Sequence, residues 1–212
     1  RDLVYIFGGS SPRDGLMGDL AALDVTSPGE DVHWAGPEFT ETTGFAPRPR
    51  ECHTCTGGGS TGRLRVYGGR GEGCVHADFC VLDLASRVWA EPKDTKMPRM
   101  AHASVDLGEK HMGVVCGCDG RALFGDFLLL NTEKMMWTEP KLTPNAPAAR
   151  MALSACLSAP TPDCLYMFGG STAEREMDDL HVVAVTKLPT VEDETVDAGA
   201  GGGTATVETN GA

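Results

Sequence analysis

The chain has 212 residues, of which 41% are hydrophobic, so it is long enough to bury a core and is not disordered throughout. Its 18 basic and 30 acidic residues give a net charge of -12, which repels nucleic-acid phosphates and anionic lipids and argues against both as partners. No window approaches 18 consecutive apolar residues and no signal-peptide pattern opens the chain, although a first residue other than Met leads us to expect missing sequence upstream.

The composition favours short strands and an intracellular location. Glycine (27) and proline (13) are frequent and aromatic residues make up only 6%, which predicts many turns between short elements. The eight cysteines are scattered, and no asparagine begins a glycosylation sequon, which favours a reducing compartment. We therefore predict an all-β protein of the cytoplasm or, as a second intracellular location, the nucleus.

The first predicted elements set a pattern for the whole chain. An apolar strand over residues 3–9 ends at Gly8–Gly9. About ten residues later Asp19 heads a second apolar strand, and Trp34 marks a further one. The sequence Pro49-Arg50 then opens the next unit with a strand of its own.

The same series recurs along the chain, which makes an internal repeat the main signal of the sequence. Apolar runs that close on glycine recur at 64–69, 112–118 and 165–170; strands headed by Asp recur at 78–82, 126–130 and 179–183. The later tryptophans and Pro/Arg openings are Trp89, Trp137, Pro98-Arg99 and the weaker 147–150. The first glycines are 60, 49 and 52 residues apart, so each unit holds four short strands.

Four antiparallel strands in about 50 residues form one blade of a β-propeller. With its Gly-Gly doublets, preceding Tyr or Phe, later Trp and Pro-Arg-x-x-His opening, the sequence resembles kelch-repeat proteins from residue 1 to about 186. The resemblance implies an all-β, kelch-type β-propeller with about four four-stranded antiparallel blades. Kelch propellers usually close with six or seven blades, and both end units are incomplete, so we expect a partial propeller.

The predicted boundaries follow the repeat. A kelch-repeat propeller is expected over residues 1–188, with units at about 1–47, 48–96, 97–147 and 148–188. The first unit lacks its opening strand, and the fourth lacks a tryptophan and its last strand. Residues 189–212 are rich in Gly, Ala, Thr and acidic residues, which predicts a disordered acidic tail, a linker to a further domain or a natural C-terminus.

The repeated residues are expected to be structural. Glycines without a Cβ can turn the chain at positive φ, aromatic side chains fill the space between blades, and arginines satisfy carbonyls or a carboxylate there. In the third unit the doublet reads Gly117-Cys118, so the turn there differs or shifts by one residue. The predicted structural residues are Gly8, Gly9, Gly68, Gly69, Gly117, Gly169, Gly170, Tyr5, Tyr67, Tyr166, Trp34, Trp89, Trp137, Arg50, Arg99 and Arg150.

No residue pattern indicates catalysis. Cys52 and Cys55 would point to opposite faces of a strand, so we interpret the cysteines as core residues and predict no metal site. His53 and His102 recur at the repeat period, which favours a structural role. No nucleophile elbow, phosphate loop or metalloprotease helix is present, and residues 57–60 indicate a hairpin turn. We predict no catalytic residue and no cofactor.

Binding is the better-supported activity, because function in repeat proteins usually lies in loops that vary between similar units. The segments after the doublets vary in this way, and they supply the candidate partner-binding residues Ser10, Arg13, Arg70, Asp119, Arg121, Ser171 and Arg175. The four arginines can form a ring that binds an acidic peptide or a carboxylate terminus, or they can be separate solvated side chains.

The sequence therefore predicts a non-enzymatic scaffold or adaptor that binds a partner's peptide or loop. A substrate adaptor of a ubiquitin ligase and a scaffold in trafficking or in the cytoskeleton are both compatible with it. The alternative is a regulatory or catalytic propeller of a larger enzyme, either phosphatase-linked or metal-dependent. Unpaired blade edges also predict self-association.

Overall fold

The computed structural model describes residues 2–27, 32–57, 62–140, 146–158 and 164–184. The chain divides into two compact units, Arg1–Met100 and Ala101–Ala212, which are described in turn. Nearly all the described elements are β-strands, and the helix α1 (Pro37–Thr40) has only four residues. Among these residues no helix is long and apolar enough to cross a membrane. The predicted tail at 189–212 and most of the predicted turn at 57–60 lie outside the described residues.

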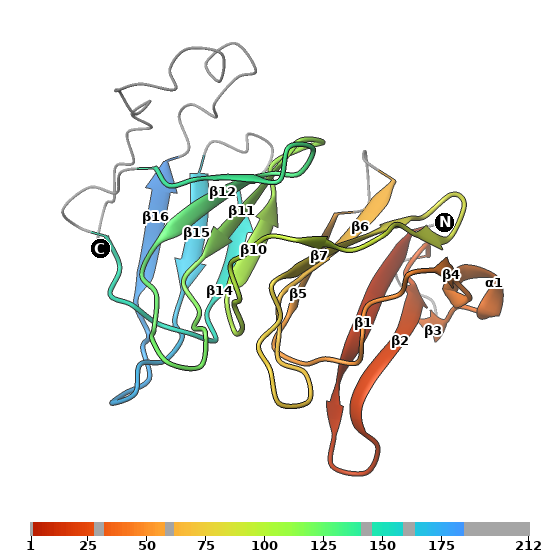
Figure 1. The fold of residues 1–212 in the computed structure, drawn as a ribbon, viewed down its shortest axis with the longest axis horizontal. Coiled ribbons are helices and arrows are strands. Elements are labelled where there is room, and N and C mark those ends of the chain that lie inside the picture. The colour runs from red at the N-terminus through yellow and green to blue at the C-terminus, as the bar shows by residue number, and fades with distance from the viewer. Residues whose placement is uncertain (1, 28–31, 58–61, 141–145, 159–163, 185–212) are drawn as a thin grey trace. The chain divides into compact units, whose positions relative to one another are not determined.

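The first sheet of unit 1 is a three-stranded antiparallel meander of β1 (Leu3–Ser11), β2 (Gly15–Asp24) and β3 (His33–Trp34). Its long β1–β2 hairpin is drawn in red in Figure 1. We expected β1 to end at its glycine doublet, but the strand continues through it with a β-bulge between Phe7 and Gly9. It can continue because the strands pair again beyond the bulge, as far as Ser11 opposite Gly15.

The second sheet of unit 1 contains the four expected strands and two more. The expected strands are β5 (Thr54–Gly57), β6 (Arg63–Tyr67), β7 (Asp78–Asp83) and β8 (Val88–Trp89), paired antiparallel in that order. The linker from the first sheet adds β4 (Thr43–Gly44) parallel to β8. The linker that leaves the second sheet adds β9 (Lys93–Asp94) beside β7.

The two sheets of unit 1 share one hydrophobic core. Phe7 and Leu20 of the first sheet pack with Val66, Leu82 and Trp89 of the second, and the rings of Phe7 and Trp89 are 5.6 Å apart. Side chains alternate between the two faces of a strand, so the neighbours of Phe7 point the other way. Val4 and Ile6 accordingly remain 49% and 45% exposed.

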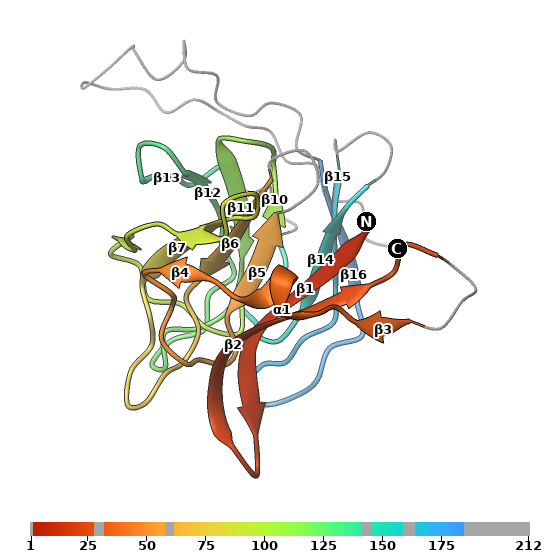
Figure 2. The ribbon, with the colours of Figure 1, turned by 90° about the vertical axis from the view of Figure 1, so that its right-hand side faces the viewer.

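Unit 2 contains a four-stranded and a three-stranded sheet, both antiparallel. The former, which we call the third sheet, consists of β10 (Ala103–Asp106), β11 (His111–Val115), β12 (Phe127–Asn131) and β13 (Met136–Thr138). The latter, the fourth sheet, consists of β14 (Ser154–Leu157), β15 (Cys164–Phe168) and β16 (Leu180–Ala184). Strand β14 lies beside β10 (Figures 1 and 2), and the two sheets enclose a core of buried apolar residues.

The glycine doublets share one backbone conformation, which also settles the register of the third unit. Gly68 and Gly69 have φ angles of 63° and 94°, and the first and fourth doublets have similar values. In the third unit the matching angles, 57° and 92°, belong to Cys116 and Gly117. The turn therefore shifts by one residue from the Gly117-Cys118 of the sequence, and a cysteine occupies a left-handed position that favours glycine.

Candidate functional site

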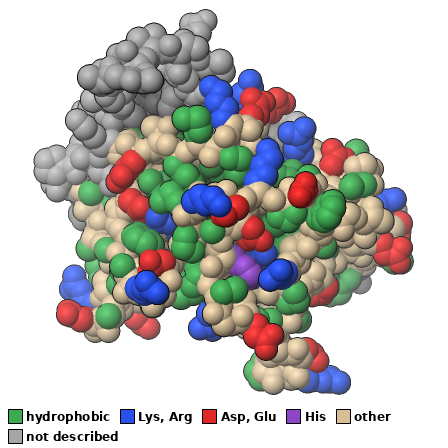
Figure 3. Space-filling view, in the orientation of Figure 1, with side chains coloured by type: hydrophobic (Ala, Val, Ile, Leu, Met, Phe, Trp, Pro, Cys, Tyr) green, Lys and Arg blue, Asp and Glu red, His purple; other side chains and the backbone are tan. Residues whose placement is uncertain are grey.

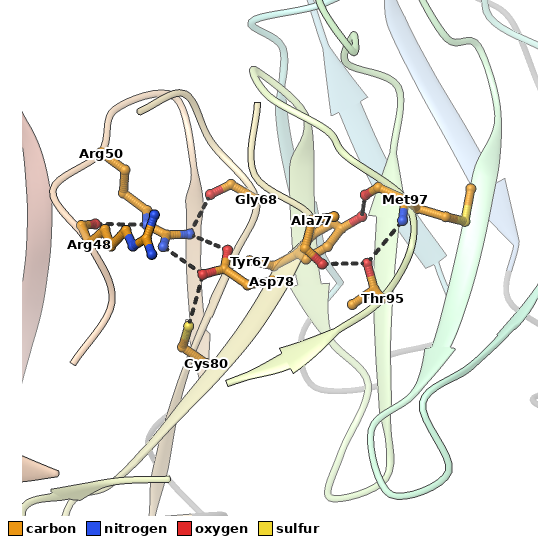
Figure 4. Close-up of polar contacts among 9 residues, drawn as sticks. All are labelled: Arg48, Arg50, Tyr67, Gly68, Ala77, Asp78, Cys80, Thr95 and Met97. Atoms are coloured by element: carbon orange, nitrogen blue, oxygen red, sulfur yellow. Dashed lines mark hydrogen bonds and ion pairs between the residues drawn. The ribbon is translucent and has the colours of Figure 1, made fainter. Parts of the chain in front are cut away.

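Buried arginines connect strands in the second and fourth repeats. The Arg50 side chain is fully buried and donates hydrogen bonds to the Gly68 carbonyl at 2.9 Å and to both Asp78 oxygens at 2.6 and 2.7 Å (Figure 4). Burial alone would raise the pKa of Asp78, but the hydrogen bonds and charge of Arg50 outweigh it and hold that pKa below its usual value. The guanidinium thus ties the doublet to the strand that follows it.

Arg150 repeats this arrangement in unit 2. It donates to the Gly169 carbonyl at 3.0 Å and to both oxygens of Asp179. Hydrogen bonds from Arg150, and a further one that joins His181, hold the pKa of Asp179 well below its usual value. Two of the predicted structural arginines therefore make the same pair of contacts in different sheets.

The backbone of the same arginines binds the preceding sheet. In the first three doublets, the second residue donates its backbone N–H to an arginine carbonyl of the next repeat, each time at 2.8 Å. These pairs are Gly9 with Arg50, Gly69 with Arg99, and Gly117 with Arg150. Each Pro/Arg segment therefore lies at the junction between consecutive repeats, which leaves the neighbouring loops free to vary in sequence.

The predicted structural aromatic residues differ in burial. Tyr67 and Trp89 are buried, and the Tyr67 hydroxyl donates to the Met97 carbonyl at 2.6 Å (Figure 4). Tyr5 and Trp137 are half-buried, Tyr166 is just exposed, and Trp34 on the short edge strand β3 is 62% exposed. A common role for these residues between blades stays a prediction.

Two of the candidate binding residues in unit 1 meet on one carboxylate. The Ser10 hydroxyl donates to Glu51, and Arg70 donates to the same carboxylate through Nε at 2.9 Å. The hydrogen bond from Ser10 has the largest effect on the pKa of Glu51, and together with that from Arg70 it lowers this pKa. Arg13 does not join them, because it lies on the hairpin tip with an exposed side chain 3.8 Å from Asp14.

The candidate binding residues of unit 2 form hydrogen bonds within or beside their own turns. Asp119 accepts hydrogen bonds from the backbone N–H groups of Arg121 and Ala122, both at 2.8 Å, and these bonds lower its pKa. Ser171 pairs through its backbone with Met151, and the backbone carbonyl of Arg175 closes the turn that follows. The side chains of Arg121 and Arg175 are exposed.

The four candidate arginines do not occupy equivalent positions. Arg70 directly follows the second doublet residue, where the other repeats carry Ser10, Cys118 and Ser171. Arg13 and Arg121 lie four residues after that doublet residue, and Arg175 lies five after it. The repeat therefore does not place the four arginines at equivalent positions, as a symmetric ring would require. Partner binding by these residues stays a prediction.

A pocket of about 610 Å³ lies beside the Glu51 network. Its lining residues are Leu16, Arg48, Pro49, Glu72, Cys74 and His76. Arg48, Cys74 and His76 could not be predicted as lining residues, because nothing in the repeat pattern distinguishes them from solvated residues. The one available signal was Arg48 itself, an additional arginine in Pro47-Arg48-Pro49-Arg50 that the other repeats lack. Residues 10–16, 48–51 and 70–76, which carry the network and the pocket, are called here the loop surface of unit 1.

The loop surface carries both basic and acidic residues. Basic and acidic side chains are interspersed over the visible face of the molecule (Figure 3). The imidazole of His76 lies against Gly71, where a Cβ would come within 2.3 Å of its Nε2. Burial first, and then the charges of Arg50 and Arg48, lower the pKa of His76, so its ring is neutral at pH 7.

The histidine and cysteine positions differ in burial, and the interpretation of the cysteines as core residues is wrong for Cys52, which is exposed because it lies in the turn before β5. His53 meets the Phe7 ring edge-on at 5.6 Å, and burial lowers its pKa. Cys52 precedes β5 with a φ of 55°, and burial raises the pKa of Cys55 to about 12. In the described parts of the chain, no three His, Cys, Asp or Glu side chains are grouped closely enough to hold a metal ion.

These sheets, joined by recurrent arginines and glycine doublets, define a partial kelch-type β-propeller. The model of the KLHDC2/KLHL20/DRC7 Kelch-repeats domain matches residues 1–195. The chain belongs to the kelch-repeat family, as its sequence motifs predicted.

Curated proteins with several different names resemble the chain. It is 27% identical to acyl-CoA-binding domain-containing protein 4 of Arabidopsis thaliana over 92% of this chain and 28% of that protein. It is 26% identical to Kelch domain-containing protein 1 of Mus musculus over 81% of this chain and 47% of that protein. It is 25% identical to the serine/threonine-protein phosphatase BSL2 of Arabidopsis thaliana over 80% of this chain and 18% of that protein. The chain thus spans between about a fifth and a half of these relatives.

Proposed function

We propose that the chain is a protein-interaction scaffold or adaptor, and that the loop surface of unit 1 binds a peptide or loop of a partner, an acidic peptide in particular. Family membership supports protein interaction in general, because a kelch-repeat domain is a module of that kind. A substrate adaptor of a ubiquitin ligase and a scaffold in trafficking or in the cytoskeleton both suit this role, in the cytoplasm or the nucleus.

The observation that carries the proposal is the contrast between the repeated geometry of two arginines within this chain and the variety of the loops beside them. Arg50 and Arg150 make matching contacts in different sheets. The residues that follow the doublets make unlike ones: Arg70 pairs with Glu51, whereas Asp119 closes a turn. Loops that differ on a constant scaffold are where repeat proteins place specific recognition.

Partner recovery tests the proposal. We expect Arg70→Ala and Arg121→Ala, introduced together into the intact parent protein, to reduce the recovery of bound proteins several-fold in affinity purification with quantitative mass spectrometry. Lys93→Ala, which removes an exposed positive charge from β9, is the matched control and keeps full recovery. Unchanged recovery with the double variant would contradict a role for these arginines.

A second proposal is that the chain is the regulatory or catalytic propeller of a larger enzyme. The similarity to the phosphatase BSL2, of which the chain covers only 18%, supports it. Elemental analysis of the purified protein separates a metal-dependent enzyme from a scaffold. Stoichiometric copper, iron or zinc would favour the enzyme and contradict a purely structural role for the cysteines and histidines.

We also propose that the chain associates with itself. The first and fourth sheets each expose apolar side chains on one face, among them Ile6 and Phe168. Exposed apolar faces and unpaired strand edges are the features through which β-sheets pair with further chains.

A further inference from the structure

Among the described residues, Arg48 is the arginine of the loop surface that has no carboxylate within ion-pair distance. Arg50 is paired with Asp78, and Arg70 is paired with Glu51. For Arg48, the described residues supply no acidic partner within ion-pair distance, and only its backbone carbonyl is used, as an acceptor for Arg50 (Figure 4). In a chain with a net charge of -12, an unpaired guanidinium at a pocket is a distinctive feature.

The walls of the pocket suit a side chain that carries a carboxylate. Leu16 and Pro49 offer apolar surface for methylene groups, and the uncharged ring of His76 completes this wall, which leaves Arg48 as the cation of the lining. A volume of about 610 Å³ is within the usual range for binding pockets and exceeds that of one side chain. A planar guanidinium binds a carboxylate through two parallel hydrogen bonds, which gives both affinity and orientation.

We propose that this pocket is a subsite for an aspartate or glutamate side chain of a protein partner, with Arg48 as its anchor. The inference rests on the proposed function and adds the residue that sets the preference for acid. Glu72 also lines the pocket, and its carboxylate repels a bound acid. The same carboxylate is suited to accept a hydrogen bond from a backbone N–H of the partner segment. The pocket therefore favours an acidic residue within a peptide over a small free anion.

Cys74 makes the local charge of the pocket measurable, because its exposed thiol is part of the lining. A thiolate displaces sulfinate from a methanethiosulfonate reagent and forms a mixed disulfide. An anionic and a cationic reagent of equal size therefore report the charge near Cys74 by their relative rates. Cys156, an exposed thiol in unit 2, is the internal reference, and mass spectrometry quantifies both adducts.

We expect Arg48→Gln to lower the anionic-to-cationic rate ratio at Cys74, relative to Cys156, about fivefold, as the loss of one charge at close range implies. Glu72→Gln raises the ratio and Arg48→Lys preserves it. Because the Arg48 side chain is exposed, Arg48→Gln leaves the thermal unfolding midpoint unchanged, which shows that the fold is intact. An unchanged rate ratio in Arg48→Gln would overturn the proposal.

A protection experiment tests the subsite itself and needs no natural partner. Millimolar acetyl-Gly-Glu-Gly-amide is expected to slow the labelling of Cys74 by neutral iodoacetamide several-fold in the full chain. The isosteric glutamine peptide gives no protection, and Arg48→Gln removes the protection by the glutamate peptide. Equal protection by the two peptides, or none by either, would overturn the subsite. Loss of partner recovery is a separate result, so the proposed function and this subsite can fail independently.

Discussion

Arg50 shows how one residue type serves both the scaffold and the junction between repeats. Its guanidinium is buried with Asp78, and its carbonyl accepts the N–H of Gly9. Desolvation offsets much of the attraction in a buried ion pair, so its main effect is to fix geometry rather than to add stability. The sequence predicted contacts of this kind from the Pro/Arg repeat. It could not predict that Glu51 neutralises Arg70, because that pair depends on which carboxylate the fold brings within reach.

His53 gives the protein a pH-dependent stability. Burial first lowers its pKa; a hydrogen bond with the Phe7 backbone opposes this effect, and the charges of Arg50 and His76 add to it. Because the pKa is lower in the folded state, the unfolded chain binds more protons as the pH falls through about 6.5, and stability is lost. We expect the thermal unfolding midpoint to fall between pH 7.5 and 5.5.

His53→Gln separates this residue from the other titrating groups. Carboxylates with lowered pKa values, such as Asp78, titrate well below this range and do not contribute to the change. We expect the variant to show a smaller drop in the midpoint between the two pH values, whatever its absolute stability. A drop as large as in the unchanged chain would show that His53 does not cause it.

Strand β4 covers the outer edge of the second sheet. Thr43 donates its backbone N–H to the Arg87 carbonyl at 3.0 Å, and the Trp89 indole donates to the Thr42 hydroxyl at 3.1 Å. Gly44 allows this approach, because a Cβ there would lie 2.3 Å from the Trp89 carbonyl oxygen and its φ is 85°. The linker thereby protects an edge that could otherwise pair with another chain.

Gly44→Ala is expected to detach β4 from β8. The Cβ collides with the Trp89 backbone, so water reaches the buried indole, and tryptophan emission shifts to longer wavelength with a loss of about 1–3 kcal/mol in the free energy of unfolding. Gly62→Ala is the matched control, since Gly62 also has a positive φ but would place its Cβ in open space. Equal spectra for the two variants would contradict this role of Gly44.

The strands that carry a repeated apolar pattern were predictable, and the added ones were not. Strands β6, β7, β11 and β12 coincide with apolar runs or with Asp-headed runs. By contrast, β4 and β9 are two residues long and pair through their backbones alone, so no side-chain period marks them. The shift of the third doublet escaped a definite prediction because a cysteine adopts the left-handed conformation there.

At the scale of the whole molecule, the described residues of each unit cover its outer sheet, the first or the fourth, on one face only. In the fourth sheet Met167 is buried in the core, whereas Phe168 and Leu180 of the opposite face are 55% and 49% exposed. The equivalent face of the third sheet is buried and carries Val115 and Phe127. A face that the repeat buries elsewhere is thus open to a further sheet, which supports the proposed self-association.

Phe168→Lys tests this association. A charged side chain on the exposed face resists burial against another chain, so we expect the variant to sediment as a smaller species than the unchanged chain in analytical ultracentrifugation. Met136→Lys is the matched control, because Met136 is similarly exposed but lies on the edge strand β13. A monodisperse monomer of the unchanged chain would contradict the proposal and favour a closed four-bladed ring.

The bond from each of the first three doublets to the following repeat imposes an order on folding during synthesis. Gly9 reaches its acceptor only when Arg50 has been made, about 40 residues later. At the usual rates of synthesis this is a delay of roughly 2–8 s. During translation the turn of each of the first three sheets is therefore secured only after the opening segment of the next repeat has been made.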